Sequence, residues 1–339
     1  MNFYDFTVDK LRRFMIEQNE NPAKSEILFD GIYRRGYKSF EEFGFSKRVV
    51  EKLSVFTFDK PEVVRKLDSA DAAKLLLRLS DGSFCETVLM RQRFGNCVCV
   101  STQVGCNMSC KFCKSGMLKK RRNLTTGEMT AQVLAVAREF SCKISGVSVM
   151  GIGEPFDNFD AVADFCSIIT EDKGLAVSRR RVTVSTCGIV PKIREFADIT
   201  PSVSLAISLH APNDELRSEL MPINKVYPIA EVLDAAAYYS KKTRKRVTLE
   251  YILLSGINDV EAHAKELAKL IRGRNLYVNL IPYNETDTNF KKPTAETVNN
   301  FCRVLKENGV IATKRREFGA ELKAACGQLM AVYTVDSEQ

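Results

Sequence analysis

Apolar positions along the chain follow two different spacings. Up to about residue 80 they recur every three to four residues, the spacing typical of helices. This pattern predicts helices over Val8–Gln18, Ser25–Arg35 and Ser46–Leu53, with Ser46 as an N-cap. The segment from Tyr33 to Phe40 mixes aromatic and basic residues, a composition that serves either nucleic-acid binding or domain packing. We therefore expect a helical module at the N-terminus.

From Lys74 onward, strand-like runs and helical stretches alternate. Leu75–Leu79 and Phe84–Met90 flank Ser80-Asp-Gly-Ser83, a pattern typical of a hairpin. Further strands are predicted at Asn96–Thr102, Gly146–Ile152, Arg181–Cys187, Val203–Leu209, Arg246–Leu254, Leu276–Pro282 and Val310–Lys314. Helices are predicted at Thr126–Phe140, Phe159–Thr170, Ile229–Ser240, Val260–Ile271 and Ala295–Asn308. Repeated strand–helix units predict an α/β fold whose parallel sheet is open or curled into a barrel, with its site at the C-terminal strand ends.

Composition narrows the class of protein. The 339 residues are 45% hydrophobic and 27% charged, which is ordinary for one large or two unequal soluble domains. No run approaches the roughly 18 apolar residues of a membrane span, and Met1–Arg13 alternates apolar with charged residues, unlike a signal peptide. Eleven cysteines, an odd number, favour a reducing cytoplasm and chemistry over a disulfide framework.

The net charge of +8 is concentrated in four basic clusters. These are Lys111–Arg122, Arg179–Arg181, Lys241–Arg246 and Lys314–Arg316. Each alone could be a solvated face. Together they favour contacts with phosphates, because the first of them adjoins a group of cysteines.

That group is Cys106, Cys110 and Cys113, spaced C-x3-C-x2-C, and no fourth cysteine or histidine stands nearby. Iron–sulfur and structural zinc sites normally take four protein ligands. Three thiolates on one loop therefore leave a metal corner open. A [4Fe–4S] cluster held in this way can bind the amino and carboxylate groups of S-adenosylmethionine and generate a radical from it. The alternative is a zinc loop closed by a distant cysteine.

Polar residues at predicted strand ends could complete such a site. Gly151-Ile-Gly153-Glu154-Pro155 follows a strand, and Glu154 could accept the cofactor's ammonium group. Four others could contact the cofactor or only cap their loops: Ser185, Ser208, His210 and Asn284. With two histidines in the chain, a Ser-His-Asp hydrolase is not expected.

Strand alternation places Glu86 on one face with Val88 and Met90. A carboxylate among apolar neighbours can serve as a base, whereas an edge-strand glutamate is the simpler interpretation. Cys97 and Cys99 share one face of the next strand, where small core residues would give the same pattern.

One more cysteine, Cys326, stands near the C-terminus in Ala324-Ala-Cys326-Gly-Gln-Leu329, after Gly319. Small neighbours and glycines can present a thiol on tight, mobile backbone. A lone cysteine is weak support for a function by itself.

Together these motifs resemble the radical-SAM 23S rRNA adenine carbon-2 methyltransferases, the RlmN family, through nearly the whole chain. The similar segments are Cys85–Met90, Cys99–Cys106, Met150–Pro155, Ser208–Pro212, Leu220–Asn224, Asn279–Asn284 and Ala325–Leu329. The resemblance implies a partial (β/α)6 barrel with a small N-terminal helical accessory domain. It divides the chain into that RNA-binding-like domain (1–75), a β-hairpin extension carrying Glu86 (76–95), the barrel (96–290) and a C-terminal helix, strand and loop carrying Cys326 (291–339).

The resemblance also implies chemistry that uses two S-adenosylmethionine molecules per turnover and one [4Fe–4S] cluster. Cys326 would carry a methyl group, Glu86 would accept the proton from the substrate carbon, and Cys99 would release the product by forming a transient disulfide with Cys326. The implied cofactor contacts are Gly153, Glu154, Ser185, Ser208, Leu209, His210 and Asn284. The implied partners are 23S rRNA, with tRNA as a further candidate substrate, and a low-potential electron donor of the flavodoxin or ferredoxin type.

Two segments depart from the family pattern: Lys114-Ser-Gly116 after the last cluster cysteine, and Glu321-Leu-Lys323 before Cys326. Three alternatives stay open. The antibiotic-resistance relative Cfr methylates carbon 8 of the same adenine, although Gly153–Asn158 and Ala211–Asn213 look more like the carbon-2 enzymes. A glycyl-radical activating enzyme shares the cysteine triplet but needs no counterpart of Cys326 or Glu86. From another class, a zinc-stabilised RNA-binding protein would have no catalysis.

Overall fold

The structure is a computed structural model that describes residues 1–199, 203–285, 289–316, 318–319, 322 and 328–329. Within these residues one large sheet has the strand order β1-β2-β3-β4-β7-β8-β9-β10-β11-β12, and β5 pairs with β6 in a separate ribbon. The strands of the large sheet are β1 Glu62–Asp68, β2 Ala72–Arg78, β3 Phe84–Gln92, β4 Gly95–Val100, β7 Ile144–Val149, β8 Val182–Thr186, β9 Ser204–Ser208, β10 Val247–Leu253, β11 Leu276–Pro282 and β12 Ala312–Lys314. The ribbon strands are β5 Gln103–Val104 and β6 Arg122–Asn123.

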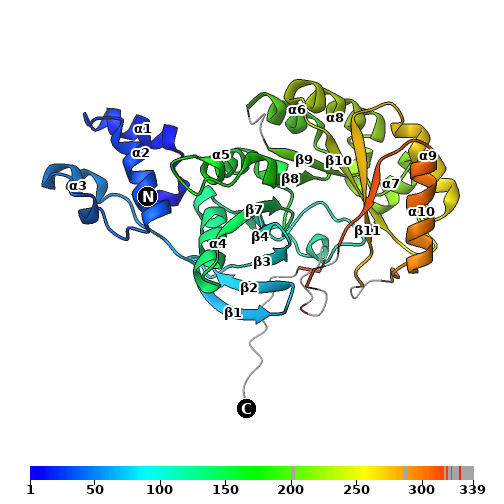
Figure 1. Ribbon diagram of the computed structural model, residues 1–339, viewed down its shortest axis with the longest axis horizontal. Coiled ribbons are helices and arrows are strands. Elements are labelled where there is room, and N and C mark those ends of the chain that lie inside the picture. Colours follow the sequence, from blue (N-terminus) through cyan, green and yellow to red (C-terminus); the bar gives the residue numbers. More distant parts are fainter. Residues whose placement is uncertain (200–202, 286–288, 317, 320–321, 323–327, 330–339) are drawn as a thin grey trace, which may run out of the picture.

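The α-helices cover the outer side of the sheet and form the N-terminal part of the molecule (Figure 1). They are α1 Val8–Glu17, α2 Lys24–Phe29, α3 Lys47–Leu53, α4 Thr126–Glu139, α5 Phe159–Thr170, α6 Val190–Ile199, α7 Asp214–Leu220, α8 Ile229–Thr243, α9 Glu261–Ile271 and α10 Ala295–Glu307. No helix in the described ranges is long and apolar enough to cross a membrane.

Strands β1 to β4 pair antiparallel, whereas each pair from β4 to β12 is parallel. Parallel neighbours need a crossover connection, and helices α4, α5, α6, α8, α9 and α10 supply it. These are six consecutive strand–helix units. Because β1 and β12 lie at the two edges of the sheet, the barrel is partial, and the predicted (β/α)6 architecture is confirmed.

The main core lies between the sheet and its helices, and the two faces of the parallel strands differ. In β8, Val182 and Val184 are buried against the helices, whereas Thr183 and Ser185 between them are only partly buried. A parallel sheet buried on both faces would show continuous apolar runs. The alternation therefore places polar side chains of β8 on the inner face of the half-barrel, where apolar residues of β10 and β11 such as Ile252 and Ile281 also lie.

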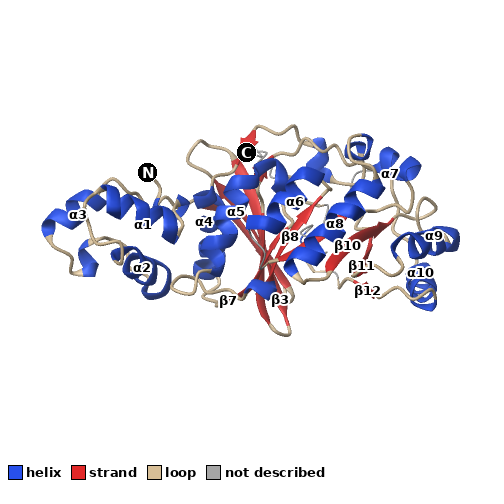
Figure 2. Ribbon diagram, turned by 90° about the horizontal axis from the view of Figure 1, so that it is seen from above, coloured by secondary structure: helices blue, strands red, loops and turns tan. Residues whose placement is uncertain are grey.

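The N-terminal part has a core of its own, on the left of Figure 2. Tyr33 and Phe40 are buried in this core, so the aromatic residues of that basic segment serve packing. Two contacts attach this part to the barrel helices: Asp5 accepts a hydrogen bond from the Gly127 N–H of α4, and Lys10 pairs with an aspartate of α5, Asp164.

The predicted boundary at residue 75 places the end of the helical part too late. Its last helix ends at Leu53, and β1 and β2 precede and cross the boundary, so the extension that carries Glu86 is a three-stranded meander rather than a hairpin alone. At the other end, α10 and β12 complete the last unit of the barrel instead of standing apart from it.

Most of the other predicted elements agree with the structure. The helix over Phe159–Thr170 and the strand over Leu276–Pro282 have the predicted bounds. Helix α4 starts with a capping box in which Thr125 and Glu128 each bond the other's backbone N–H. Helices α6 and α7 had no predicted counterpart. Pro191 lies in the first turn of α6, the one place where a helix tolerates proline.

Candidate active site

The cysteine loop follows β5, just after the first strand of the half-barrel, as predicted. The β5–β6 ribbon closes its base, and the Cys106 N–H donates to the Leu118 carbonyl at 2.9 Å. Gly105 has φ +81° there, and a Cβ would lie 2.4 Å from the Lys119 carbonyl oxygen, so only glycine fits. The loop is also held from outside, since the Lys111 N–H donates to the Leu220 carbonyl at 3.0 Å.

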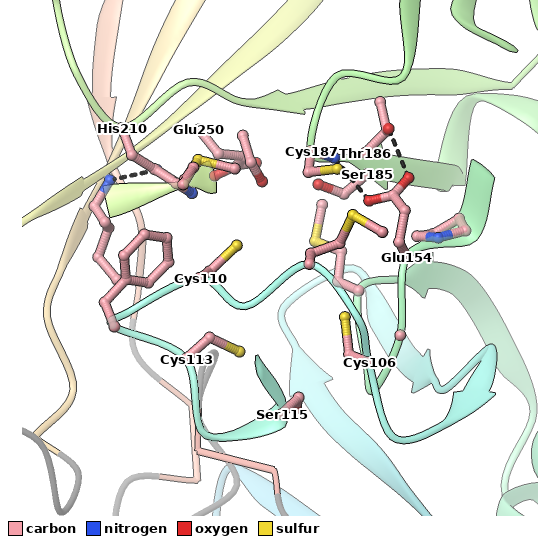
Figure 3. Close-up of a pocket in the computed structure, with 18 of the residues that line it drawn as sticks. Cys106, Cys110, Cys113, Ser115, Glu154, Ser185, Thr186, Cys187, His210 and Glu250 are labelled. Atoms are coloured by element: carbon pink, nitrogen blue, oxygen red, sulfur yellow. Dashed lines mark hydrogen bonds between the residues drawn. The ribbon is translucent and has the colours of Figure 1, made fainter. Parts of the chain in front are cut away.

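The thiols of Cys106, Cys110 and Cys113 point into one space at the C-terminal ends of the strands (Figure 3). This space belongs to a cavity of about 870 Å³, partly open to solvent, whose walls also include Glu154, Ser185, Ser208 and His210. The structure thus brings together residues that lie more than 100 positions apart in the sequence.

The charge of the thiols fits an iron–sulfur cluster. Burial raises the pKa of Cys106 to about 12 and that of Cys110 well above its usual value. Three thiolates in this place need compensating positive charge, which bound iron supplies. In the described part of the chain, no three His, Cys, Asp or Glu side chains converge on one metal ion.

Glu154 follows the glycine loop at the end of β7. Gly153 has φ +105°, and a Cβ there would lie 2.6 Å from the Gln103 side chain. The Glu154 carboxylate accepts hydrogen bonds from Thr186 Oγ1 at 2.6 Å, the Cys187 N–H at 2.8 Å and the Phe156 N–H at 3.0 Å.

The Cys187 thiol also donates to this carboxylate, so Glu154 has four hydrogen-bond partners within the protein. Burial raises the pKa of Glu154, against the opposing effect of these four hydrogen bonds. A cationic ammonium group would stabilise the charged form.

His210 is held rigidly in a left-handed conformation, with φ +60°. Its Nδ1 accepts the Ile252 N–H at 3.0 Å, which places the proton of the neutral ring on Nε2. Burial and the neighbouring Arg217 lower its pKa to about 3, so the ring is neutral near pH 7. The ring packs edge-on against Phe112 of the cysteine loop, with centroids 4.9 Å apart. The sequence left open whether His210 is a hydrogen-bonded loop residue or faces the cofactor site. In the structure it is hydrogen-bonded in its loop and also lines the cavity.

Arg217 of α7 is the main residue that sequence reasoning missed. It is fully buried, and all five of its N–H groups donate to oxygen atoms. The acceptors are the carbonyls of Cys187, Ser208, Leu209 and Tyr227 and the side chain of Asn224. Arg217 thus ties together the strand ends on which Ser208 and Cys187 stand.

Two predicted cofactor contacts do not line the cavity. The Leu209 side chain packs in the core on the helix side, so only its backbone could reach a cofactor. Asn284 is buried just beyond β11. Conversely, Thr186 and Cys187 line the cavity without having been predicted. Their position directly after Ser185 at a strand end was the available signal.

The second group of candidate residues lies on the inner face of β3 and β4. Val88 pairs with Cys99 and Met90 with Cys97, so Glu86 shares a face with both cysteines. Glu86 is buried, and its Oε1 lies 2.8 Å from Lys74 Nζ. Because β3 lies between β2 and β4, Glu86 is not on an edge strand.

Leu329, near the C-terminus, packs in one apolar cluster with Val88, Cys99 and Ile152. Its carbonyl accepts a hydrogen bond from Ser115 Oγ at 3.0 Å, so the departure at Lys114–Gly116 still provides an anchor beside the cysteine loop. Cys326 and the departure at Glu321 and Lys323 lie outside the described residues.

Comparison with known proteins agrees with this geometry. The family profile of the radical SAM superfamily matches residues 100–271. A probable dual-specificity RNA methyltransferase RlmN of Malacoplasma penetrans is 46% identical over 338 residues, covering 97% of this chain and 95% of that protein. One from Clostridium perfringens is 47% identical, covering 98% and 97%. The crystal structure of a radical SAM methyltransferase from Sphaerobacter thermophilus has a TM-score of 0.90 and 40% identity, and covers 98% of this chain and 100% of that one. The chain therefore belongs to the radical SAM superfamily and, within it, to the RlmN family of RNA methyltransferases.

Proposed function

We propose that this protein methylates carbon 2 of an adenine in 23S rRNA, and that a tRNA adenine is a second substrate. One observation carries the proposal: three converging thiols share a cavity with Glu154 and His210, in a chain matched along its length by relatives named dual-specificity RNA methyltransferases. Membership of the superfamily implies S-adenosylmethionine and a [4Fe–4S] cluster.

Cys106, Cys110 and Cys113 would hold three irons of the cluster, leaving the fourth iron for S-adenosylmethionine. When bound, the cluster and this cofactor supply a 5′-deoxyadenosyl radical, with electrons from a low-potential donor of the flavodoxin or ferredoxin type. Glu154, whose carboxylate lines the same cavity, would accept a hydrogen bond from the cofactor's ammonium group. Ser185, Ser208, His210 and the Gly153 backbone would orient the rest of the cofactor, with the Leu209 backbone and Asn284 nearby.

Radical chemistry is needed because carbon 2 of adenine is electron-poor and does not attack a methyl sulfonium directly. We propose that the Cys326 thiolate does so instead: its sulfur gains the methyl group of a first S-adenosylmethionine, and S-adenosylhomocysteine leaves. A second molecule supplies the radical that removes one hydrogen atom from the S-methyl group. The resulting methylene carbon then bonds to carbon 2.

Two residues of the inner face would complete the reaction. The adduct formed at carbon 2 is a radical, so it would return one electron to the cluster as Glu86 takes the proton from carbon 2. The buried position of Glu86 beside Lys74 is suited to a fixed base. Cys99 would bond to the Cys326 sulfur and break the sulfur–carbon bond, and the released methylene carbon would take up a proton to give the methyl group of the product. Two electrons must then reduce this disulfide before the next turnover. Leu329 packs in the same apolar group of side chains as Cys99. Because Leu329 is only three residues beyond Cys326 in the sequence, and three extended residues span about 10 Å, the chain length is compatible with a bond between Cys99 and Cys326.

The test is mass spectrometry of adenosines from 23S rRNA that lacks the modification. The RNA would be incubated anaerobically with reconstituted protein, reductant and S-adenosylmethionine. We expect 2-methyladenosine. A product of 8-methyladenosine would assign the protein to the Cfr-like enzymes, and intact cofactor cleavage with no methylated adenosine would refute the proposed substrate. Zinc without iron or sulfide after anaerobic purification would refute the whole mechanism.

A further inference from the structure

A second, larger cavity opens at the opposite end of the half-barrel from the cysteines. Its volume is about 1750 Å³, again partly open to solvent, and it lies at the N-terminal ends of β8, β10 and β11. Met150, Glu250 and Arg315 line both cavities, so the two spaces meet inside the half-barrel. A ligand that enters from this end can therefore approach the cofactor site.

The wall of this cavity combines apolar residues, such as Met90 and Phe318, with a row of small polar side chains. Between apolar residues that face the helices, the inner face presents Ser148, Thr183, Ser204, Thr248 and Asn279. The Ser148 hydroxyl is one of three buried side-chain polar atoms without a hydrogen-bond partner in the described part of the chain. Small polar residues of this kind leave a wet passage rather than a packed core.

Arginine dominates the charge of the cavity. We call the following six residues the arginine mouth: Arg93, Arg180, Arg181, Arg246, Arg315 and Arg316. The one carboxylate in the same wall is Glu250, which lies 3.6 Å from Arg315 and accepts a hydrogen bond from Asn279 at 2.9 Å. The cavity thus carries a large excess of positive charge.

Most of these cations lack a counter-ion. Among the described residues, no carboxylate lies within 4.0 Å of Arg93, Arg180, Arg181 or Arg246. Lys245 lies close to the same arginines. Burial lowers the pKa of Lys245, and the positive charges of Arg180 and Arg179 lower it further. Concentrated like charge destabilises the empty site and attracts a polyanion.

An aromatic side chain stands at the rim. Phe94, at the tip of the β3–β4 hairpin, is 50% exposed. The Arg181 guanidinium lies over its ring, 4.8 Å from the centroid, and Arg181 Nη1 donates to the Phe94 carbonyl at 2.9 Å. Exposed aromatic rings combined with arginines are typical of sites that stack unpaired bases and hold the phosphates between them.

We propose that the arginine mouth binds the RNA strand on either side of the target adenosine, with Phe94 as a stacking platform for a neighbouring base. This inference rests on the proposed function, because it assumes an RNA substrate. An acidic electron-donor protein would also be attracted by the charge. A nucleic-acid strand fits better, because the arginines line a concave passage that a folded protein surface cannot enter.

The test measures RNA binding by the reconstituted holoenzyme at several salt concentrations. For Arg180→Ala/Arg246→Ala we expect about tenfold weaker binding at low salt. The slope of log Kd against log salt should fall by roughly 1.4–1.8, since each lost phosphate contact removes about 0.7–0.9. Arg180→Lys/Arg246→Lys should keep the slope. The matched control, Lys265→Ala/Arg303→Ala, removes two charges from the outer helices α9 and α10 and should bind as the unmodified protein does.

Phe94→Ala should weaken binding without changing the salt slope, because stacking releases no counterions. An unchanged slope in the double alanine variant would overturn the inference. A second result would also overturn it: a variant that binds RNA normally and methylates it with a chemical reductant but not with a protein electron donor. The arginine mouth would then be a docking surface for the donor. Failure of the proposed function would look different, as absence of methyladenosine with the unmodified protein.

Discussion

The polar side chains at the two ends of the half-barrel differ in burial and in hydrogen bonding. At the cysteine end, Glu154, His210 and Arg217 are buried and their positions are fixed by hydrogen bonds to neighbouring backbone. At the other end, Arg180 and Arg246 are exposed and have no carboxylate partner among the described residues. The side chains at the cysteine end are therefore fixed before a ligand binds, whereas those at the arginine mouth are in contact with solvent.

This difference matches two kinds of ligand. A small cofactor must be held with one particular bond facing the reactive centre. Groups that are already fixed in place bind it without a loss of side-chain entropy. A polyanion gains affinity from released counterions, which requires charge in the right region rather than one fixed geometry. The predictions below test whether the two ends divide the work in this way.

The largest effect is expected from loss of a cluster ligand. Cys110→Ala should abolish bound iron and sulfide, formation of 5′-deoxyadenosine and RNA methylation together, because two thiolates cannot hold the cluster against solvent. Iron and sulfide analysis after anaerobic reconstitution measures this. The control is Cys142→Ala, which removes a half-buried cysteine far from the cavity. RNA binding at the arginine mouth should survive in both variants, and its loss in Cys110→Ala would show that the two ends are not independent.

Removing the proposed methyl carrier should abolish RNA methylation without affecting the chemistry at the cofactor end. Cys326→Ala should make no methylated RNA and still cleave S-adenosylmethionine, since the cofactor end is intact. Cys99→Ala and Glu86→Ala should instead trap a covalent protein–RNA adduct, seen as a shifted band that nuclease shortens. Retained methylation by Cys326→Ala would refute the carrier role, and normal turnover without an adduct would refute the roles of Cys99 and Glu86.

The fixed geometry of the cofactor end depends most on Arg217. Arg217→Met should lower the free energy of unfolding by about 3–5 kcal/mol, because four buried carbonyls and Asn224 lose their donor. Thermal unfolding and S-adenosylmethionine binding measure the effect. Arg217→Lys should not restore either, since three ammonium donors cannot replace the planar five. Arg194→Met, on the exposed side of α6, is the control and should change stability by less than about 1 kcal/mol.

Arg217 also shows where sequence reasoning stopped. The spacing of Cys106, Cys110 and Cys113 is local and predicted the loop directly. Strand alternation placed Glu86 with Val88 and Met90, but only the register of β3 and β4 brings Glu86 and Cys99 onto one face. Arg217 acts by joining carbonyls from β8, β9 and the loop before α8, a relation that exists only after folding. Its helix has seven residues, too short for a clear apolar period.

Other differences have the same origin. The arginines of Arg179–Arg181 and Lys241–Arg246 were recognised as basic runs, but their meeting at one cavity depends on the order of β8 and β10 in the sheet. The strand β1 was missed because its burial alternates only weakly, as is usual at a sheet edge. The sequence therefore did not provide the contacts between elements, nor the elements whose apolar period is short or weak: β1, α6 and α7.

The neutral His210 predicts a pH dependence of stability. Its pKa is about 3 in the folded protein against an ordinary 6.5. Between these values the unfolded chain binds a proton that the folded chain does not, so stability falls as pH falls. The stabilisation is complete above pH 6.5 and decreases by about 1.4 kcal/mol per pH unit below it. Unfolding of the unmodified protein and of His210→Asn, compared from pH 7 to pH 5, should show the steeper slope in the unmodified protein; parallel curves would mean that His210 is charged in the folded state.

The smallest effect on stability is expected at the arginine mouth itself. Arg180→Ala/Arg246→Ala removes two exposed side chains without carboxylate partners, so the free energy of unfolding should change by no more than about 0.5 kcal/mol, and relief of repulsion with Lys245 favours a slight gain. Thermal unfolding at low and high salt measures this, and any gain should shrink as salt screens the charges. A loss as large as that of Arg217→Met would mean that these arginines hold the fold together. In that case the weaker RNA binding of the variant would no longer identify a binding surface, and the contrast between a fixed end and a solvated end would fail.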